Sequence, residues 1–146
     1  MKKIDYKLCS AQMEDCGDTN GCTVIALAQL LNIDYYAANE LARNEYGRKW
    51  RQGMYTFDLL YMYKKELAKL GKKLVKLDTK AILAKVDRHN YRVKTLTSNN
   101  IKMANITGRC VVLTRSHVAI LENNQMSDWT VNKATHVKSV YQVQGV

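Results

Sequence analysis

The sequence lacks proline altogether and contains only seven glycines among its 146 residues. No serine- and glycine-rich run separates two halves and no segment repeats, which excludes an evident linker or low-complexity region. A chain of this length is close to the commonest domain size and buries about two-thirds of its unfolded surface on folding. We therefore predict a single domain that spans residues 1–146.

Long apolar runs are also missing from the sequence. No apolar stretch follows Lys2 and Lys3, and no later window approaches the roughly 18 apolar residues that a membrane helix needs. The four cysteines occur without a secretory signal in a chain large enough to fold without disulfides, which favours thiols in a reducing compartment. These absences predict a cytoplasmic protein that contacts no membrane and keeps a thiolate available for chemistry.

Acidic residues are scarce relative to basic ones. The chain has 13 Asp and Glu against 23 Lys and Arg, a formal net charge of +10. A field of that sign attracts nucleic acid, anionic surfaces or acidic proteins and does not choose among them. The simpler alternative is that many lysines only solvate helix faces. This alternative applies to Lys64, Lys65, Lys69, Lys72 and Lys73.

The first half of the chain has the pattern of helices. Residues 23–31 are apolar at nearly every position, which is typical of a mostly buried helix. Thr19 or Asn20 is a suitable N-cap for it. The spacing of apolar residues then predicts two further helices, over residues 35–43 and 56–70.

The second half is predicted to form strands. Residues 73–77 and 92–96 alternate like short strands, while residues 79–86 are ambiguous between helix and strand. After Gly108 the pattern is plainly β, with an Asn-Asn turn signal at residues 123–124. The predicted strands of this region cover residues 109–114, 117–121, 125–131 and 138–143. Helices followed by a sheet indicate an α+β domain.

Cys22 is placed where a thiol can be activated. It would lie in the first turn of the helix over residues 23–31, where N–H groups lack an intrahelical partner and the helix dipole is positive. Such a position stabilises a thiolate and aims the backbone N–H at a developing oxyanion. The same cysteine also suits a small buried hydrophobic residue, so the spacing alone leaves both interpretations open.

Thiol catalysis also needs a histidine to accept the proton and a polar group to orient it. A hairpin that turns at residues 123–124 places His117 opposite Thr130. Asp128 is then the diagonal neighbour on the same face, about 7–8 Å away. A one-residue slip would turn Asp128 to the other face. His117 also fits a core or edge histidine, and Asp128 a surface acid beside a turn.

Gly21–Ala28 (GCTVIALA) and Asn32–Ala38 (NIDYYAA) form two neighbouring apolar segments. They resemble the nucleophile helix and second helix of small papain-like cysteine peptidase proteins found in bacteriophage genomes. Residues 53–71, 94–97 and 108–129 resemble, in the same order, the next helix, a strand and a Gly-His-x-x-Ala hairpin that ends in Asp-Trp. The resemblance implies a papain-like α+β fold, in which N-terminal helices, including the nucleophile helix, pack on a C-terminal antiparallel sheet.

By position, the resemblance implies that Cys22 is the nucleophile, His117 the base and Asp128 the third member of the triad, with Trp129 shielding the last two. The implied activity is a peptidase or amidase-like hydrolase that acts through a thioester and needs no metal or cofactor. Its implied substrate is a protein or peptide, including a bacterial host protein, and its compartment the host cytoplasm. Ser116 departs from the glycine that usually precedes the histidine.

The oxyanion donor is less clearly indicated. Cys16 stands six residues before Cys22, where larger papain-like enzymes have a glutamine. Asn20 is the first candidate donor and Gln12 the second. Cys16 is also an alternative nucleophile, although two adjacent carboxylates would raise its pKa. A zinc site from Cys9, Cys16, Cys22 and a histidine lacks the usual paired short spacing.

The second functional interpretation is a non-catalytic binding protein on the same fold. Arg48, Lys49, Trp50 and Arg51, here called the basic loop, combine cations with an aromatic side chain, which suits phosphates and exposed bases. Such a protein would grip a host protein or nucleic acid, for example to counter a bacterial defence. We predict that the basic loop serves binding rather than folding.

Overall fold

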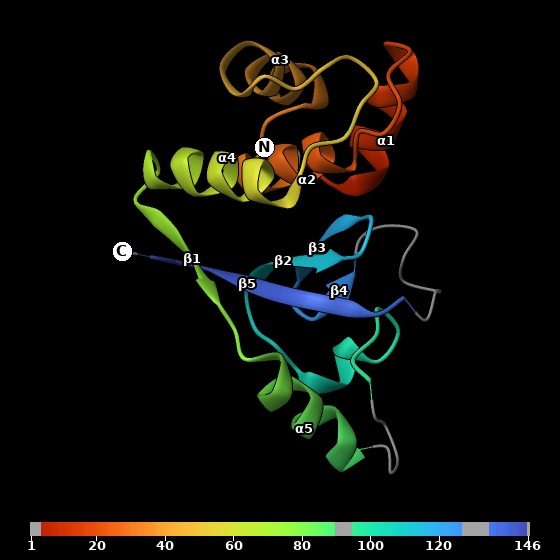
Figure 1. The fold of residues 1–146 in the computed structure, drawn as a ribbon, viewed down its shortest axis with the longest axis vertical. Helices are drawn as coiled ribbons and strands as arrows, with labels where there is room; N and C mark the ends of the chain where they lie inside the picture. The colour runs from red at the N-terminus through yellow and green to blue at the C-terminus, as the bar shows by residue number, and fades with distance from the viewer. Residues whose placement is uncertain (1–3, 90–94, 127–134, 146) are drawn as a thin grey trace. The chain divides into compact units, whose positions relative to one another are not determined.

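The structure is a computed structural model that describes residues 4–89, 95–126 and 135–145. It divides into two compact units, residues 1–73 with 145–146, and residues 74–144. Figure 1 shows helices in the first unit and a sheet with further helices in the second. Helices together with antiparallel strands confirm the predicted α+β class. The single domain over residues 1–146 stays a prediction.

In the first unit, helix α2 packs against the three other helices. The helices are α1 (Tyr6–Asp15), α2 (Cys22–Leu31), α3 (Tyr35–Tyr46) and α4 (Thr56–Ala68). Every side chain from Thr23 to Leu30 is buried, so the apolar run forms a buried helix as predicted. The sequence pattern does not predict α1, because Cys9 is its single buried residue and the helix presents no apolar stripe.

A capping side chain explains where helix α3 begins. The Asp34 side chain accepts a hydrogen bond of 2.8 Å from the N–H of Ala37 and starts α3. Helix α2 differs, because its N-cap is Gly21, which contributes no capping side chain. The predicted N-cap role of Thr19 or Asn20 is therefore wrong. Asn20 instead adopts a left-handed conformation, with φ of 55°.

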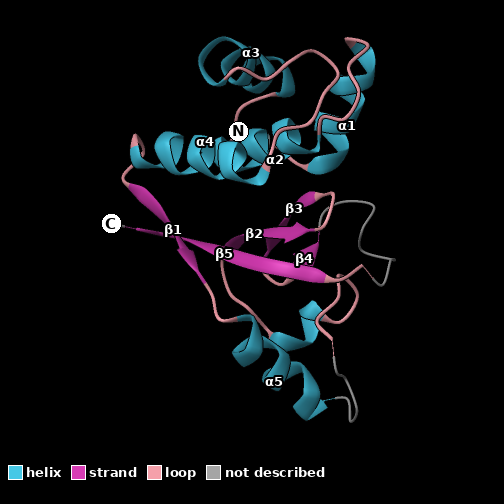
Figure 2. Ribbon diagram, in the orientation of Figure 1, coloured by secondary structure: helices cyan, strands magenta, loops and turns pink. Residues whose placement is uncertain are grey.

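The second unit is built on a five-stranded sheet in the order β1-β5-β2-β3-β4. Its strands are β1 (Lys72–Lys76), β2 (Arg109–Thr114), β3 (Val118–Glu122), β4 (Gln125–Met126) and β5 (Val137–Gly145). The long strand β5 lies between β1 and β2 (Figure 2). The pairs β2–β3, β2–β5 and β3–β4 are antiparallel. The strand predicted over residues 92–96 and the end of that over 125–131 fall largely outside the described residues.

The predicted turn at Asn123 and Asn124 joins β3 to β4. Both residues have left-handed φ values, 47° and 67°, as in the type I′ turns that favour two-residue hairpins. Glu122 pairs with Gln125, which confirms the predicted register next to the turn. The pairing of His117 with residue 130 lies outside the described residues.

Helix α5 (Thr79–His89) and the 3₁₀-helix η1 (Ile101–Ala104) share a core with the sheet. This core includes Ile82, Val86, Ile101, Cys110, Val112, Leu121 and Val140. The ambiguous segment 79–86 is helical because it places Ile82 and Val86 in that core. Val111 and Ile120, which alternate with the core residues along β2 and β3, are also fully buried. Burial of both faces explains why these strands read as continuous apolar runs.

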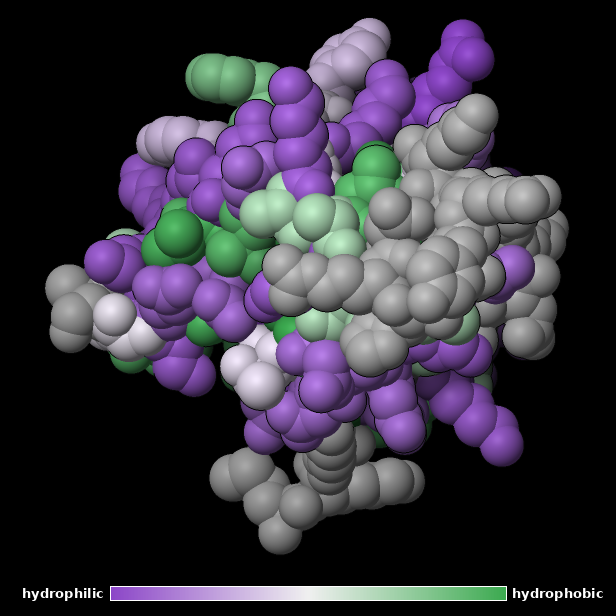
Figure 3. Space-filling view, turned by 90° about the horizontal axis from the view of Figure 1, so that it is seen from below, coloured by the Kyte–Doolittle hydropathy of each residue, from purple (hydrophilic) through white to green (hydrophobic). Residues whose placement is uncertain are grey.

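Among the residues coloured in Figure 3, hydrophilic ones predominate, and hydrophobic ones form several smaller areas. All five lysines that the sequence assigned to solvation are exposed. In the described parts of the chain, no helix is both long enough and apolar enough to cross a membrane.

Candidate functional site around Cys22

Cys22 is the first residue of α2, and its side chain is partly exposed. Its predicted position in the first turn is confirmed. First-turn N–H groups have no acceptor within their own helix, and the helix dipole is positive at this end. Both effects favour the thiolate form of a cysteine.

The backbone just before Cys22 is tightly enclosed. A Cβ atom on Gly21 would overlap the Tyr35 hydroxyl group and lie 2.7 Å from the sulfur of Met13. These separations are shorter than van der Waals contact, so a side chain at position 21 would require Tyr35 or Met13 to move. Helices α1 and α3 thereby fix the point at which α2 begins.

Tyr63 of α4 supports the same turn. It is fully buried, and its hydroxyl group donates a hydrogen bond of 2.7 Å to the Thr23 carbonyl oxygen. Burial raises the pKa of Tyr63 well above its usual value, and the negative charge of a Cys22 thiolate raises it further. Tyr63 therefore remains a neutral phenol next to the candidate nucleophile.

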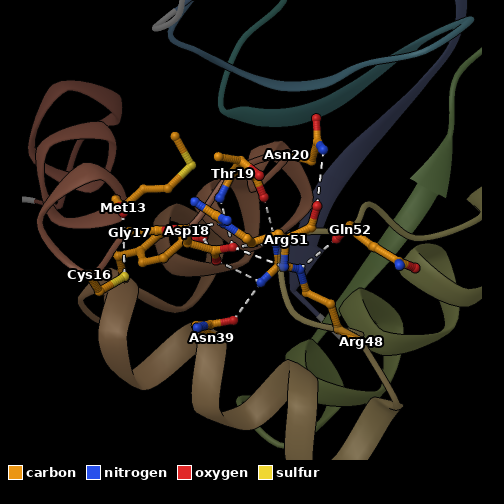
Figure 4. Close-up of polar contacts among 11 residues, drawn as sticks. Met13, Cys16, Gly17, Asp18, Thr19, Asn20, Asn39, Arg48, Arg51 and Gln52 are labelled. Carbon is orange, nitrogen blue, oxygen red and sulfur yellow. Dashed lines mark hydrogen bonds and ion pairs between the residues drawn. The ribbon is translucent and has the colours of Figure 1, made fainter.

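A buried polar network around Asp18 holds the segment that leads into α2 (Figure 4). The Asp18 carboxylate accepts hydrogen bonds of 2.8 and 3.2 Å from the two Nη atoms of Arg48, and both side chains are wholly buried. It also accepts from the Tyr35 hydroxyl group and from the N–H groups of Thr19 and Arg51. The carboxylate thus links the loop between α1 and α2 and the loop between α3 and α4 to helix α3.

The network satisfies both charges of this ion pair. Burial by itself raises the pKa of Asp18, but the hydrogen bonds from Arg48 and Tyr35 and the charge of Arg48 outweigh it, so the pKa lies below its usual value. Arg48 donates further hydrogen bonds to Asn39 Oδ1 at 2.6 Å and to two backbone carbonyl oxygens. A buried ion pair with this many partners is costly to break from one side.

Arg48 therefore departs from the prediction made for the basic loop. Its side chain is buried and binds Asp18, so this residue serves folding rather than binding. Arg51 has an exposed side chain, but its Nε donates to the Gly17 carbonyl oxygen at 3.0 Å. The sequence gives little signal of this pairing, because Asp18 lies thirty positions before Arg48 in a stretch with no periodic pattern.

Lys49, Trp50 and Arg51 of the basic loop are exposed. The Arg43 guanidinium lies 5.0 Å from the centre of the Trp50 ring, within the range of a cation–π contact. Lys49 and Trp50 provide the exposed cation and aromatic ring that the binding hypothesis requires.

Both predicted oxyanion donors have other hydrogen bonds. The Asn20 amide nitrogen donates to the Arg51 carbonyl oxygen at 3.0 Å, a bond it would have to exchange to reach an oxyanion. Gln12 uses its amide oxygen to accept from the N–H of Tyr35 at 2.8 Å. That bond does not involve the amide nitrogen, which is the atom an oxyanion requires.

The other three cysteines have different surroundings from Cys22. Cys9 and Cys110 are fully buried, and burial raises their pKa values to about 12 and about 11. Cys16 is partly exposed at the end of α1, and its thiol donates to the Met13 carbonyl oxygen at 3.4 Å. The described residues contain no group of three or more His, Cys, Asp or Glu side chains placed to hold a metal ion.

His117 belongs to the second unit and directly precedes β3. Its carbonyl oxygen accepts hydrogen bonds from the N–H and hydroxyl groups of Thr114, at 2.9 and 3.1 Å. These bonds close the β2–β3 connection and fix the backbone of His117 on the sheet. Asp128 and Trp129 lie outside the described residues.

Comparisons of the chain with family models, curated proteins and solved structures found no match.

Proposed function

We propose that the chain is a papain-like cysteine hydrolase, with Cys22 as nucleophile, His117 as base and Asp128 as the group that orients the histidine. The observation that carries the proposal is the place of Cys22, a partly exposed thiol at the first position of a buried helix. The similarity of GCTVIALA to the nucleophile helix of phage papain-like proteins supports it. The raised pKa values of Cys9 and Cys110 leave those thiols protonated and unreactive at neutral pH.

In the proposed reaction, His117 takes the proton of the Cys22 thiol, and the sulfur forms a bond with the acyl carbon of an amide. The negative charge that develops on the carbonyl oxygen is stabilised by the N–H group of Cys22. The carbon–nitrogen bond then breaks and the leaving amine takes the proton from His117. Water hydrolyses the thioester and restores the thiol.

The proposed substrate class is the amide bond of a protein or peptide, including a host protein if the chain is encoded by a phage. The proposed compartment is the cytoplasm, where the thiols stay reduced. The buried network around Asp18 fits this proposal, because a nucleophile acts best on a rigid, preorganised support.

An activated ester tests the nucleophile without knowledge of the substrate. On brief incubation with p-nitrophenyl acetate at neutral pH, we expect an acetyl group on Cys22, located by peptide mass mapping. Cys22→Ser and His117→Ala should each slow acetylation at least a hundredfold, and Asp128→Ala less. Cys16→Ser is the matched control and should be acetylated on Cys22 as fast as the parent protein. Acetylation of Cys16 in place of Cys22 would show that the nucleophile is misassigned.

A non-catalytic binding protein on the same fold is the second candidate, favoured by the exposure of Lys49 and Trp50. In such a protein Cys22 contributes only packing. A folded Cys22→Ser variant that keeps its full biological effect would therefore support the binding protein over the hydrolase.

A further inference from the structure

Helix α4 carries exposed aromatic rings that do not pack in the hydrophobic core. Phe57 and Tyr61 are 81% and 53% exposed, and Tyr55, just before the helix, is 84% exposed. Phe57 is the only phenylalanine of the chain. The buried face of α4 is already filled by Leu59, Met62, Tyr63, Glu66 and Leu67. A phenylalanine left in water loses the stabilisation of about 1.5–3 kcal/mol that burial of its side chain would give. Folding therefore does not explain why these rings are exposed.

Two lysines continue the same face of the helix. Residues three and four positions apart share a helix face, so Phe57, Tyr61, Lys64 and Lys65 form one line, here called the α4 stripe. The Nζ atom of Lys65 lies 5.5 Å from the centre of the Tyr61 ring and 3.3 Å from its hydroxyl oxygen. Asp58 stands in the first turn of the helix, where a negative charge complements the dipole.

Neighbouring residues extend this surface with the same chemistry. The ring of Tyr46, on α3, contacts that of Tyr61 edge to face, with centres 6.3 Å apart. Arg43 lies one turn before Tyr46 on α3 and covers the ring of Trp50, which is 39% exposed. The surface therefore pairs an exposed aromatic ring with a cation at two places.

We propose that the α4 stripe binds single-stranded nucleic acid, with bases stacked on Phe57 and Tyr61 and phosphates beside Lys64 and Lys65. Exposed rings accept any base because every base has a flat π-face, and lysines track the backbone. The charge of +10 draws such a polyanion from a distance. This binding does not depend on the proposed thiol chemistry.

Geometry favours a single strand over a duplex. Phe57 and Tyr61 are one turn apart, or about 6 Å along the helix axis, whereas stacked bases are about 3.4 Å apart in a duplex strand. Bases that meet both rings must therefore be unstacked from each other. An acidic protein would be attracted by the lysines, but its carboxylates have no flat face to stack on the rings.

Fluorescence anisotropy with a labelled 12-nucleotide oligothymidine, compared with a 12-base-pair duplex, tests the proposal on the full chain. We expect tighter binding to the single strand and about tenfold weaker binding after Phe57→Ala. Replacing Lys64 and Lys65 together by Gln should lower the slope of log affinity against log salt by about 1.4, since each phosphate contact on a single strand contributes about 0.7.

The exposed lysines Lys80 and Lys85 of α5 provide the matched control. Their joint replacement by Gln removes the same charge and should change the affinity less than twofold. Circular dichroism checks that each variant is folded. Because Phe57 is highly exposed, replacing it by Ala should not disturb the fold. The proposal fails if the oligonucleotide does not bind in low salt, if the duplex binds as well, or if Phe57→Ala binds like the parent. It also fails if replacing Lys80 and Lys85 weakens binding as much as replacing Lys64 and Lys65. Displacement of the oligonucleotide by polyglutamate at the same total concentration of negative charge would indicate an acidic protein partner and would also overturn the proposal.

Discussion

At the scale of single residues, the position of Arg48 in the sequence and its position in the structure point to opposite roles. In the sequence it begins the run Arg48-Lys49-Trp50-Arg51, whose cations and aromatic ring indicate binding. In the structure it is 4% exposed and paired with Asp18. The difference arises because a buried cation needs an anion, and the chain supplies that anion from a distant loop. Local charge patterns do not contain this information.

Replacing Arg48 therefore tests folding rather than binding. Arg48→Ser leaves the Asp18 carboxylate buried without a counter-charge, and we expect the free energy of unfolding to fall by about 3–5 kcal/mol. The neighbouring Lys49→Ser is the control and should change stability by less than about 0.5 kcal/mol. Urea denaturation followed by circular dichroism measures both. Equal stability of the two variants would show that the ion pair does not support the fold.

The pKa of Asp18 predicts how stability depends on pH. Because this pKa is lowered by folding, the carboxylate stabilises the protein above its unfolded value of 3.8, and the stabilisation is lost as the pH falls through the folded value. Asp18→Asn should reduce stability at pH 7 and flatten the loss of stability in acid. Thermal melting across pH 2–7 measures this effect. An unchanged acid slope in Asp18→Asn would assign the acid sensitivity to other carboxylates, such as Glu66.

At the scale of elements, apolar runs predicted helices α2, α3 and α4 and strands β2 and β3 close to their observed bounds. Apolar patterns could not predict helix α1, because it buries only Cys9. Its position depends on capping by Asp5 and on packing against α2 and α3. The N-cap of α2 was also predicted wrongly. It is Gly21, whose backbone lies close to the Tyr35 hydroxyl group, a contact that depends on tertiary packing.

A methyl group at Gly21 should disturb the start of α2. Gly21→Ala forces overlap with Tyr35 and Met13, and overpacking of this kind costs about 1–3 kcal/mol. Gly53→Ala is the control, since a Cβ atom there meets nothing within 4 Å. Differential scanning calorimetry should show a melting temperature several degrees lower for Gly21→Ala than for Gly53→Ala. A Gly21→Ala variant as stable as the control would mean that Tyr35 and Met13 yield easily.

At the scale of the whole molecule, the two members of the proposed site that the structure describes belong to different units. Cys22 is fixed by the helices and His117 by the β2–β3 connection. Cys22 lies in the first turn of its helix, as the apolar run predicted, and His117 directly precedes the strand that was predicted to begin with it. The buried network that supports the Cys22 turn was not predicted, because it joins three loops and helices through side chains far apart in the chain.

The pH dependence of Cys22 alkylation tests most directly whether Cys22 and His117 work as one site. Iodoacetamide labelling is followed by peptide mass mapping in the parent protein, in His117→Ala and in the control His136→Ala. A thiolate paired with an imidazolium reacts well below the ordinary thiol pKa of about 8.5. We therefore expect rapid labelling of Cys22 near pH 6 in the parent and in His136→Ala, and a shift of the profile toward pH 8.5 in His117→Ala. A folded His117→Ala protein with the same Cys22 profile as the parent would contradict the proposed catalytic pair.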